Sequence, residues 1–141
     1  MTDVTTATAT DTVVLGPNQY GKAENHVVRI NRDTDRHEIR DLVVTSQLRG
    51  DFQAVHTVGD NAHCVPTDTQ KNTVFAFAQQ HGIASPEALL LKLSEHFTSE
   101  FSWVDGGRWA ADRPYGLIEA TIQRKGAPEN EHAWMGIAGF C

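Results

Sequence analysis

The run from Ile39 to Leu48 alternates between apolar and polar residues over ten positions. Successive side chains of a β-strand point to opposite faces, so this run predicts a strand with one buried and one solvated face. Its apolar side is carried by Leu42, Val44 and Leu48. The β-branched run His26–Ile30 precedes it, and the charged segment Asn31–Arg36 between the two has the composition of a loop. The two runs therefore predict an antiparallel hairpin.

Two amphipathic helices are predicted after this hairpin. The first runs from Asp68 to His81 and is followed by Gly82, a residue common just after a helix end. The second starts at Ser85-Pro86, a cap followed by a first-turn proline, and Gly106-Gly107 is expected to end it. Apolar residues at helical spacing are Val74, Phe75, Phe77 and Ala78 in the first helix, and Leu89, Leu90, Leu93, Phe97 and Phe101 in the second.

Three further segments complete the predicted fold. Phe52–His56 keeps a period of two and is interpreted as a continuation of the second strand, while Leu117–Ile122 is interpreted as a further strand. The apolar segment Trp134–Cys141 is expected to dock on a surface. The order β-β-α-α-β predicts an α+β domain, with two helices packed on one face of an antiparallel sheet. If the last strand replaces a missing pair, this sheet would have three strands.

Length and charge narrow the class of protein. A chain of 141 residues suits one domain, and Met1–Thr12 is expected to be a disordered lead-in because it holds little that could be buried. There are 12 Lys and Arg against 18 Asp and Glu, which argues against a nucleic-acid partner. No window approaches the roughly 18 apolar residues of a membrane span. Cys64 and Cys141 form no redox or metal spacing, and a reducing cytoplasm is the expected location.

The motifs of several enzyme classes are missing from the sequence. None of the seven histidines pairs with another at the three- or four-residue spacing of a helical metal site. The chain also has no glycine-rich phosphate loop and no Gly-x-Ser-x-Gly elbow. A metal ion is therefore not expected, and nucleotide hydrolysis and serine esterase chemistry have no motif support.

Polar residues gather where the first helix begins. Thr67 and Gln70 have the spacing of a capping box, which makes Thr67 or Asp68 the expected N-cap. The free amides and the dipole of a helix start suit an anion or a polar heterocycle, although capping alone would also explain these residues. Lys22 stands near the start of a strand, where a lysine is commonly a solvated edge residue. A second interpretation is that Lys22 takes a proton from an acidic heterocycle and that a threonine relays it.

Four motifs resemble urate oxidase (uricase) in its bacterial form. They are Asn18–Glu24, with Tyr-Gly-Lys at its centre, His37–Leu42, Gly59–Asn61 and Pro66–Thr73. The resemblance runs from about Val13 to Trp109. It implies the T-fold, in which two helices cover one face of an antiparallel sheet. A whole uricase has two such halves and assembles as a homotetramer around a tunnel, with its sites between subunits.

The resemblance also implies roles for individual residues. Lys22 would be the base, Thr67 its relay partner, and the Thr67-Asp68 region a cradle for the purine edge. Lys22 and Thr67 of one site are expected to come from different subunits. The implied reaction is the oxidation of urate by O2 to 5-hydroxyisourate with release of H2O2, without metal or organic cofactor.

The sequence departs from the uricase pattern near its end. Residues 13–111 resemble the first uricase half, whereas 112–141 resemble the C-terminal end of the second, and Ala110-Ala111 is the expected joint. The chain thus resembles a uricase with a large internal deletion. The missing part supplies the family's stacking phenylalanine, its clamping arginine and glutamine, and the relay histidine, so little or no activity is expected. The alternatives are a non-catalytic T-fold assembly module or truncation product, and a T-fold cyclohydrolase, which would require zinc.

Overall fold

The computed structural model describes residues 14–114 and 116–124, and the backbone of 136–139. Its strands are β1 (Tyr20–Asn31), β2 (Glu38–Gly50), β3 (Val104–Arg113), β4 (Gly116–Gln123) and β5 (Gly136–Gly139). Its helices are α1 (Gln53–Thr57), the 3-10 helix η2 (Asn61–His63), α2 (Thr67–His81) and α3 (Pro86–Glu100). The predicted lead-in at 1–12 lies outside the described residues.

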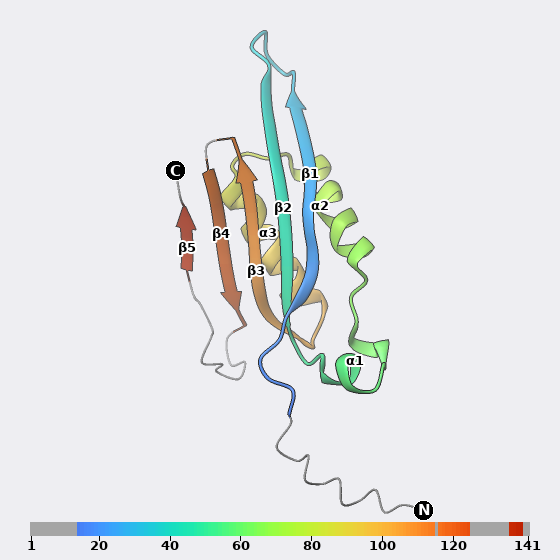
Figure 1. The fold of residues 1–141 in the computed structure, drawn as a ribbon. Coiled ribbons are helices and arrows are strands. Elements are labelled where there is room, and N and C mark those ends of the chain that lie inside the picture. Colours follow the sequence, from blue (N-terminus) through green and yellow to red (C-terminus); the bar gives the residue numbers. More distant parts are fainter. Residues whose placement is uncertain (1–13, 115, 125–135, 140–141) are drawn as a thin grey trace, which may run out of the picture.

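The strands form one antiparallel sheet in the order β1-β2-β3-β4-β5. Helices α2 and α3 cover one face of this sheet, and the other face is open (Figure 1). The predicted α+β class and the packing of two helices on one face are confirmed.

The core lies between the sheet and the two helices, where the period-two and helical patterns placed it. Leu42, Val44 and Leu48 of β2 are at most 2% exposed. The helix residues packed with them are Val74 and Ala78 of α2 and Leu89, Leu90, Leu93 and Phe97 of α3. Phe75 is an exception, because it is 42% exposed on the outer side of α2.

The prediction of a three-stranded sheet was wrong, since five strands are seen among the described residues. Strand β3 was missed because Gly106-Gly107 was interpreted as a helix end. A Cβ on Gly107 would lie 2.3 Å from the carbonyl oxygen of Gln47. The glycine is therefore needed for the close approach of β3 to β2. Within the segment Trp134–Cys141, which was expected to dock on a surface, Gly136–Gly139 forms β5 beside β4. The rest of that segment lies outside the described residues, so the expected docking stays a prediction.

The continuation of the second strand through Phe52–His56 was wrong as well. The amide of Asp51 makes a ladder bond with Trp103 O at 2.9 Å, and after it the chain turns to local hydrogen bonds, with the His56 amide donating to Phe52 O. Phe52 is 1% exposed and anchors α1 against the core. The local structure is therefore determined by contacts between residues distant in the sequence, which a period-two pattern cannot predict.

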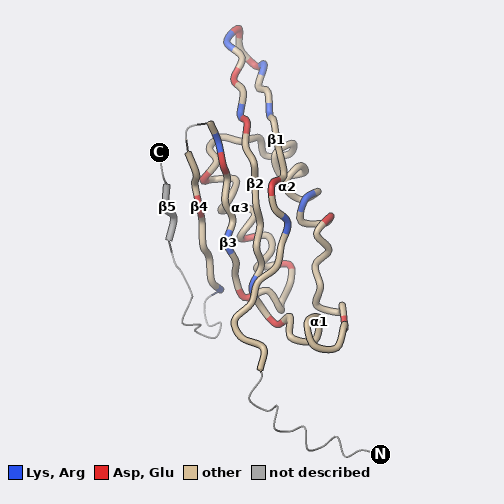
Figure 2. Tube along the Cα trace, in the orientation of Figure 1, with Lys and Arg blue, Asp and Glu red and all other residues tan. Residues whose placement is uncertain are grey.

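Strands β1 and β2 extend past the rest of the sheet as a two-stranded arm (Figure 1). Figure 2 shows both signs of charge interspersed toward the tip of this arm. Its open face carries three exposed apolar side chains, Val28, Ile30 and Ile39. Ile30 and Ile39 are directly opposite each other in the β1–β2 register.

Candidate functional site

Lys22 lies near the start of β1, the edge strand of the described sheet, and is partly buried. Its register partner is Ser46 of β2. The Ser46 hydroxyl donates to Gln70 Oε1 of α2 at 2.8 Å, so the Ser46 side chain faces the helices. Directly opposite residues of an antiparallel pair share a face. Lys22 is therefore on the helix-covered side, next to α2.

A β-bulge just beyond Lys22 makes this orientation compatible with the core. The register shifts between Lys22 and Asn25, and Glu24 has a φ of 56° within the shift. Without the extra residue, Lys22 and the core residue Val27 would point to opposite faces. Asn25, which is 4% exposed, donates from Nδ2 to Val44 O and holds the bulge in place.

Thr67 is the first residue of α2, and the predicted capping box is not formed. Pro66 occupies the N-cap position, with no side-chain cap hydrogen bond. Gln70 does not reach back to the helix start, because its side chain is 0% exposed and is taken up by Ser46 and by Val65 O. Neither the Lys22 nor the Thr67 side chain hydrogen-bonds to another described residue. The structure thus gives the Thr67 hydroxyl no part in holding the helix.

Asp68 follows in the first turn of α2, where a negative charge suits the helix dipole. Its carboxylate lies 3.6 Å from Lys71 Nζ, and the Asp68 side chain is 81% exposed. An ion pair this exposed is weak, so the carboxylate is available to another partner.

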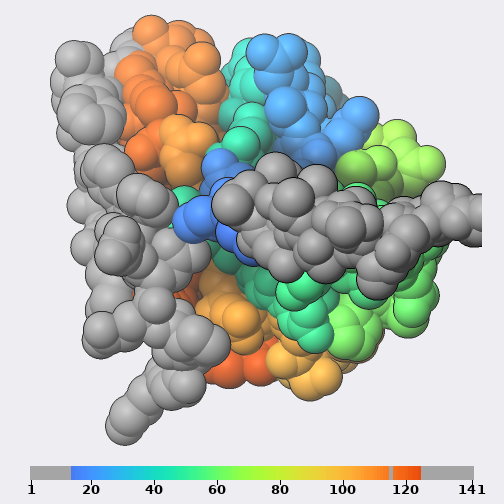
Figure 3. Space-filling model, turned by 60° about the horizontal axis from the view of Figure 1, so that its bottom comes forward, coloured from blue at the N-terminus to red at the C-terminus, as the bar shows by residue number. Residues whose placement is uncertain are grey.

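Tyr20 ties the start of β1 to the start of α2. Its hydroxyl donates to Val65 O at 3.0 Å and accepts from the Val65 amide at 2.6 Å. Its ring meets the Phe52 ring edge-on at 4.8 Å. Burial raises the pKa of the Tyr20 phenol, and the neighbouring Cys64 raises it further. The start of β1 is seen beside the α1–α2 segment in Figure 3.

These contacts put Lys22 and Thr67 of one chain on the helix-covered side of the sheet, at the start of β1 and the start of α2. Lys22 is opposite Ser46, Ser46 is bonded to Gln70, and Thr67 precedes Gln70 by less than one helical turn. The resemblance led us to expect that the two residues of one site come from different subunits. The register shows only that Lys22 and Thr67 of one chain lie on the same side of the sheet, and the origin of the two residues of one site stays a prediction.

Tyr20, Ser46 and Gln70 hold this arrangement, a role that the sequence patterns did not predict for them. One signal was present. Ser46 is a polar residue on the apolar face of β2, between Val44 and Leu48, and a buried hydroxyl requires a partner.

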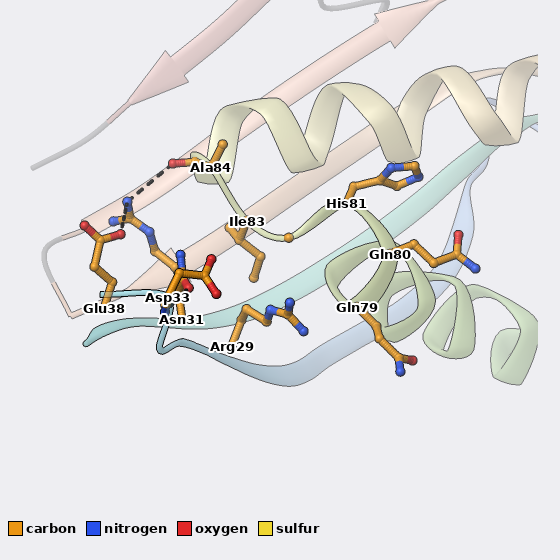
Figure 4. A pocket seen from close by; sticks show the side chains of 11 residues that line it. Arg29, Asn31, Asp33, Glu38, Gln79, Gln80, His81, Ile83 and Ala84 are labelled. Atoms are coloured by element: carbon orange, nitrogen blue, oxygen red, sulfur yellow. Dashed lines mark hydrogen bonds and ion pairs between the residues drawn. The ribbon is translucent and has the colours of Figure 1, made fainter. Parts of the chain in front are cut away.

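A separate hollow of about 420 Å³ lies at the far end of α2, under the arm (Figure 4). Its charged lining is balanced, with two arginines and two carboxylates, Arg29, Arg40, Asp33 and Glu38. Arg40 is already bonded to Ala84 O at 3.4 Å and lies 3.9 Å from Glu38. The hollow contains neither Lys22 nor Thr67.

The described side chains are those of residues 14–114 and 116–124. Within them, no three side chains among His, Cys, Asp and Glu are grouped closely enough to hold a metal ion. The same part of the chain has no helix that is long and apolar enough to cross a membrane. The predicted absence of a metal and the predicted cytoplasmic location stay predictions.

A family model described as "Uricase" matches residues 18–132. The chain belongs to the uricase family. Uricase of Arthrobacter globiformis is 64% identical over 110 residues, which is 77% of this chain and 36% of that protein. Uricase of Drosophila virilis is 41% identical over 86 residues, 61% of this chain and 25% of that protein.

Solved structures of uricases share the fold. The crystal structure of the Arthrobacter globiformis uricase superposes with a TM-score of 0.72 at 54% identity, over 82% of this chain and 46% of that one. A uricase from Bacillus fastidious gives a TM-score of 0.64 at 19% identity, over 86% of this chain and 50% of that one. The predicted T-fold is thus confirmed. The chain spans between about a quarter and a half of the length of these relatives.

Proposed function

We propose that this chain carries the proton-handling part of a urate oxidase site. The reaction is the oxidation of urate by O2, without metal or organic cofactor. Urate loses two electrons to O2, which is reduced to H2O2, and water supplies the hydroxyl group of 5-hydroxyisourate. Lys22 takes the proton, Thr67 relays it, and the Asp68 carboxylate with the first amides of α2 binds the polar edge of the purine.

The register that brings Lys22 and Thr67 to one side of the sheet is the observation that carries this proposal. A proton relay needs its two groups within hydrogen-bond reach of one substrate. Thr67 is free for such a role because it makes no cap hydrogen bond and is exposed at the helix start. Family membership supplies the substrate class.

We further propose that the chain by itself turns over urate far more slowly than an intact uricase. It matches 36% of the length of the Arthrobacter relative. The groups that stack on and clamp the purine in the family have no counterpart among the motifs of this chain. Poor positioning of a substrate can cost about 10²-fold in rate.

A homo-oligomer with sites between subunits fits the same proposal. The exposed side chains of Val28, Ile30 and Ile39 form an apolar strip on the open face of the arm, and β1 is an edge strand of the described sheet. Such strips and edges favour association. The strip also supports a second candidate, a non-catalytic assembly module. Light scattering of the purified chain measures its oligomeric state.

The loss of urate absorbance, together with peroxide release, tests the proposed function. The purified chain should oxidise urate at least about 10²-fold more slowly than the intact Arthrobacter uricase. Any residual turnover should disappear in Lys22→Met, which keeps a side chain of similar length. Turnover near the rate of the intact relative, or turnover unchanged in Lys22→Met, contradicts the proposal.

A further inference from the structure

We propose that Tyr20 is a positioning residue, which sets where Thr67 lies relative to Lys22. The inference rests on the proposed function for the identity of the pair. Its structural part stands on contacts that do not depend on urate.

Tyr20 links the two segments that carry Lys22 and Thr67. Tyr20 precedes Lys22 by two positions on β1, and Val65 precedes Thr67 by two positions. A single oxygen, Tyr20 Oη, joins these segments by hydrogen bonds of 3.0 and 2.6 Å to both polar groups of Val65. A displacement of this oxygen therefore moves the start of α2 relative to the start of β1.

A hydroxyl group is suited to this link because it donates and accepts at the same time. Val65 precedes the helix and is 1% exposed, so its amide has neither a helical partner nor water. Burial raises the pKa of the Tyr20 phenol, which therefore stays protonated and keeps its donor at neutral pH. The edge-on contact with Phe52 fixes the ring that carries the hydroxyl group.

A second hydrogen bond makes it possible to distinguish the positioning of Thr67 from the docking of α2 on the sheet. The Ser46–Gln70 hydrogen bond joins β2 to the first turn of α2, and both side chains are 0% exposed. Loss of the Tyr20 hydroxyl group leaves this bond in place. Helix α2 then stays docked on the sheet and Val65 O keeps its bond from Gln70 Nε2, while the Val65 amide loses its partner and the segment from Val65 to Thr67 is held less firmly.

The Tyr20→Phe variant tests the proposal because it removes the hydroxyl group and keeps the ring. Amide hydrogen exchange and amide chemical shifts are measured by NMR on the uniformly labelled chain. Exchange should speed up about tenfold at Val65, with shift changes at Thr67 and Asp68, while the later turns of α2 keep their protection. Urate, used as the probe, should bind Tyr20→Phe several-fold more weakly than the wild-type chain.

Ser94→Ala is the matched control. Ser94 is 2% exposed, and its hydroxyl group donates to Leu91 O at 2.7 Å, far along the chain from α2. This variant also loses one buried hydroxyl group, but it should leave the Val65 exchange rate and urate binding unchanged. If Tyr20→Phe matches wild type at Val65 and Thr67, or changes all amides uniformly, the positioning role is refuted. If urate fails to bind the wild-type chain, the proposed function fails, whereas the exchange data still decide the role of Tyr20.

Discussion

Thr67 shows at the scale of a single residue how one sequence signal can have two physical meanings. Its spacing to Gln70 is that of a capping box, yet α2 starts at Thr67 itself and Gln70 turns into the core. Ser85 has the role expected for Thr67, since its hydroxyl group accepts from the Ala88 amide at 3.1 Å. The two residues therefore allow a matched comparison.

Ser85→Ala should lower the free energy of unfolding by about 1 kcal/mol, because the start of α3 loses its cap. Thr67→Ala should change it by less than about 0.5 kcal/mol, because no cap bond is lost at α2. Urate binding should respond in the opposite way, weakened by Thr67→Ala and unaffected by Ser85→Ala. Urea unfolding and a urate titration measure the two effects. Equal destabilisation by both variants would mean that Thr67 is a structural cap.

Gln70 and Ser46 give a second prediction at this scale. Gln70→Leu leaves the Ser46 hydroxyl group without its buried acceptor and should cost about 1–3 kcal/mol. The double variant, which adds Ser46→Ala, should recover part of that loss because neither polar group is then left unpaired. Urea unfolding of the two single variants and the double variant measures the coupling. Strictly additive losses would contradict a direct Ser46–Gln70 bond.

At the scale of elements, the segments with a strong local pattern were predicted and those decided by distant partners were not. The alternation in β2 and the apolar spacing in α3 reflect burial against one neighbour, so the sequence alone reports them. Strand β3 depends on the close approach of Gly107 to β2, and α1 depends on the anchoring of Phe52. Likewise, the register that pairs Lys22 with Ser46 follows from a bulge that no periodicity predicts.

The end of α3 is likewise stabilised by a residue that is distant in the sequence. Arg124, the residue after β4, donates from its guanidinium group to Ser102 O at 2.7 Å and to Phe101 O at 2.9 Å, and it also contacts Thr98 O. A cation that satisfies the free carbonyls of a helix end also complements its dipole. Strand β4 thereby holds the end of α3.

Arg124→Ala should lower the free energy of unfolding by about 1.5–3 kcal/mol, because several charge-assisted hydrogen bonds are lost together. Arg124→Lys should lose less unfolding free energy than Arg124→Ala, since lysine keeps the positive charge but not the five donors of the guanidinium group. Thermal unfolding and the exchange rates of the last-turn amides of α3 measure both effects. Wild-type stability in Arg124→Ala would contradict a capping role.

At the scale of the whole molecule, one T-fold sheet with two helices is present in a chain that covers a fraction of its relatives. The expected joint at Ala110-Ala111 lies within β3, which continues to Arg113 and pairs with β2 and β4 on either side. Strand β3 therefore runs through the expected joint without a break in its pairing. Lys22 is separated from that joint by β2, since its partner Ser46 pairs in turn with Trp109, the residue before Ala110.

A urate titration of the isotope-labelled chain, followed by NMR, tests most directly whether Lys22 and Thr67 form one part of a urate site. The predicted result is a saturable set of shift changes at the amides of Thr67 and Asp68 and at the Lys22 side chain, which Lys22→Met abolishes. Shift changes confined to the hollow lined by Arg29 and Arg40, or no saturable change at all, would contradict the account.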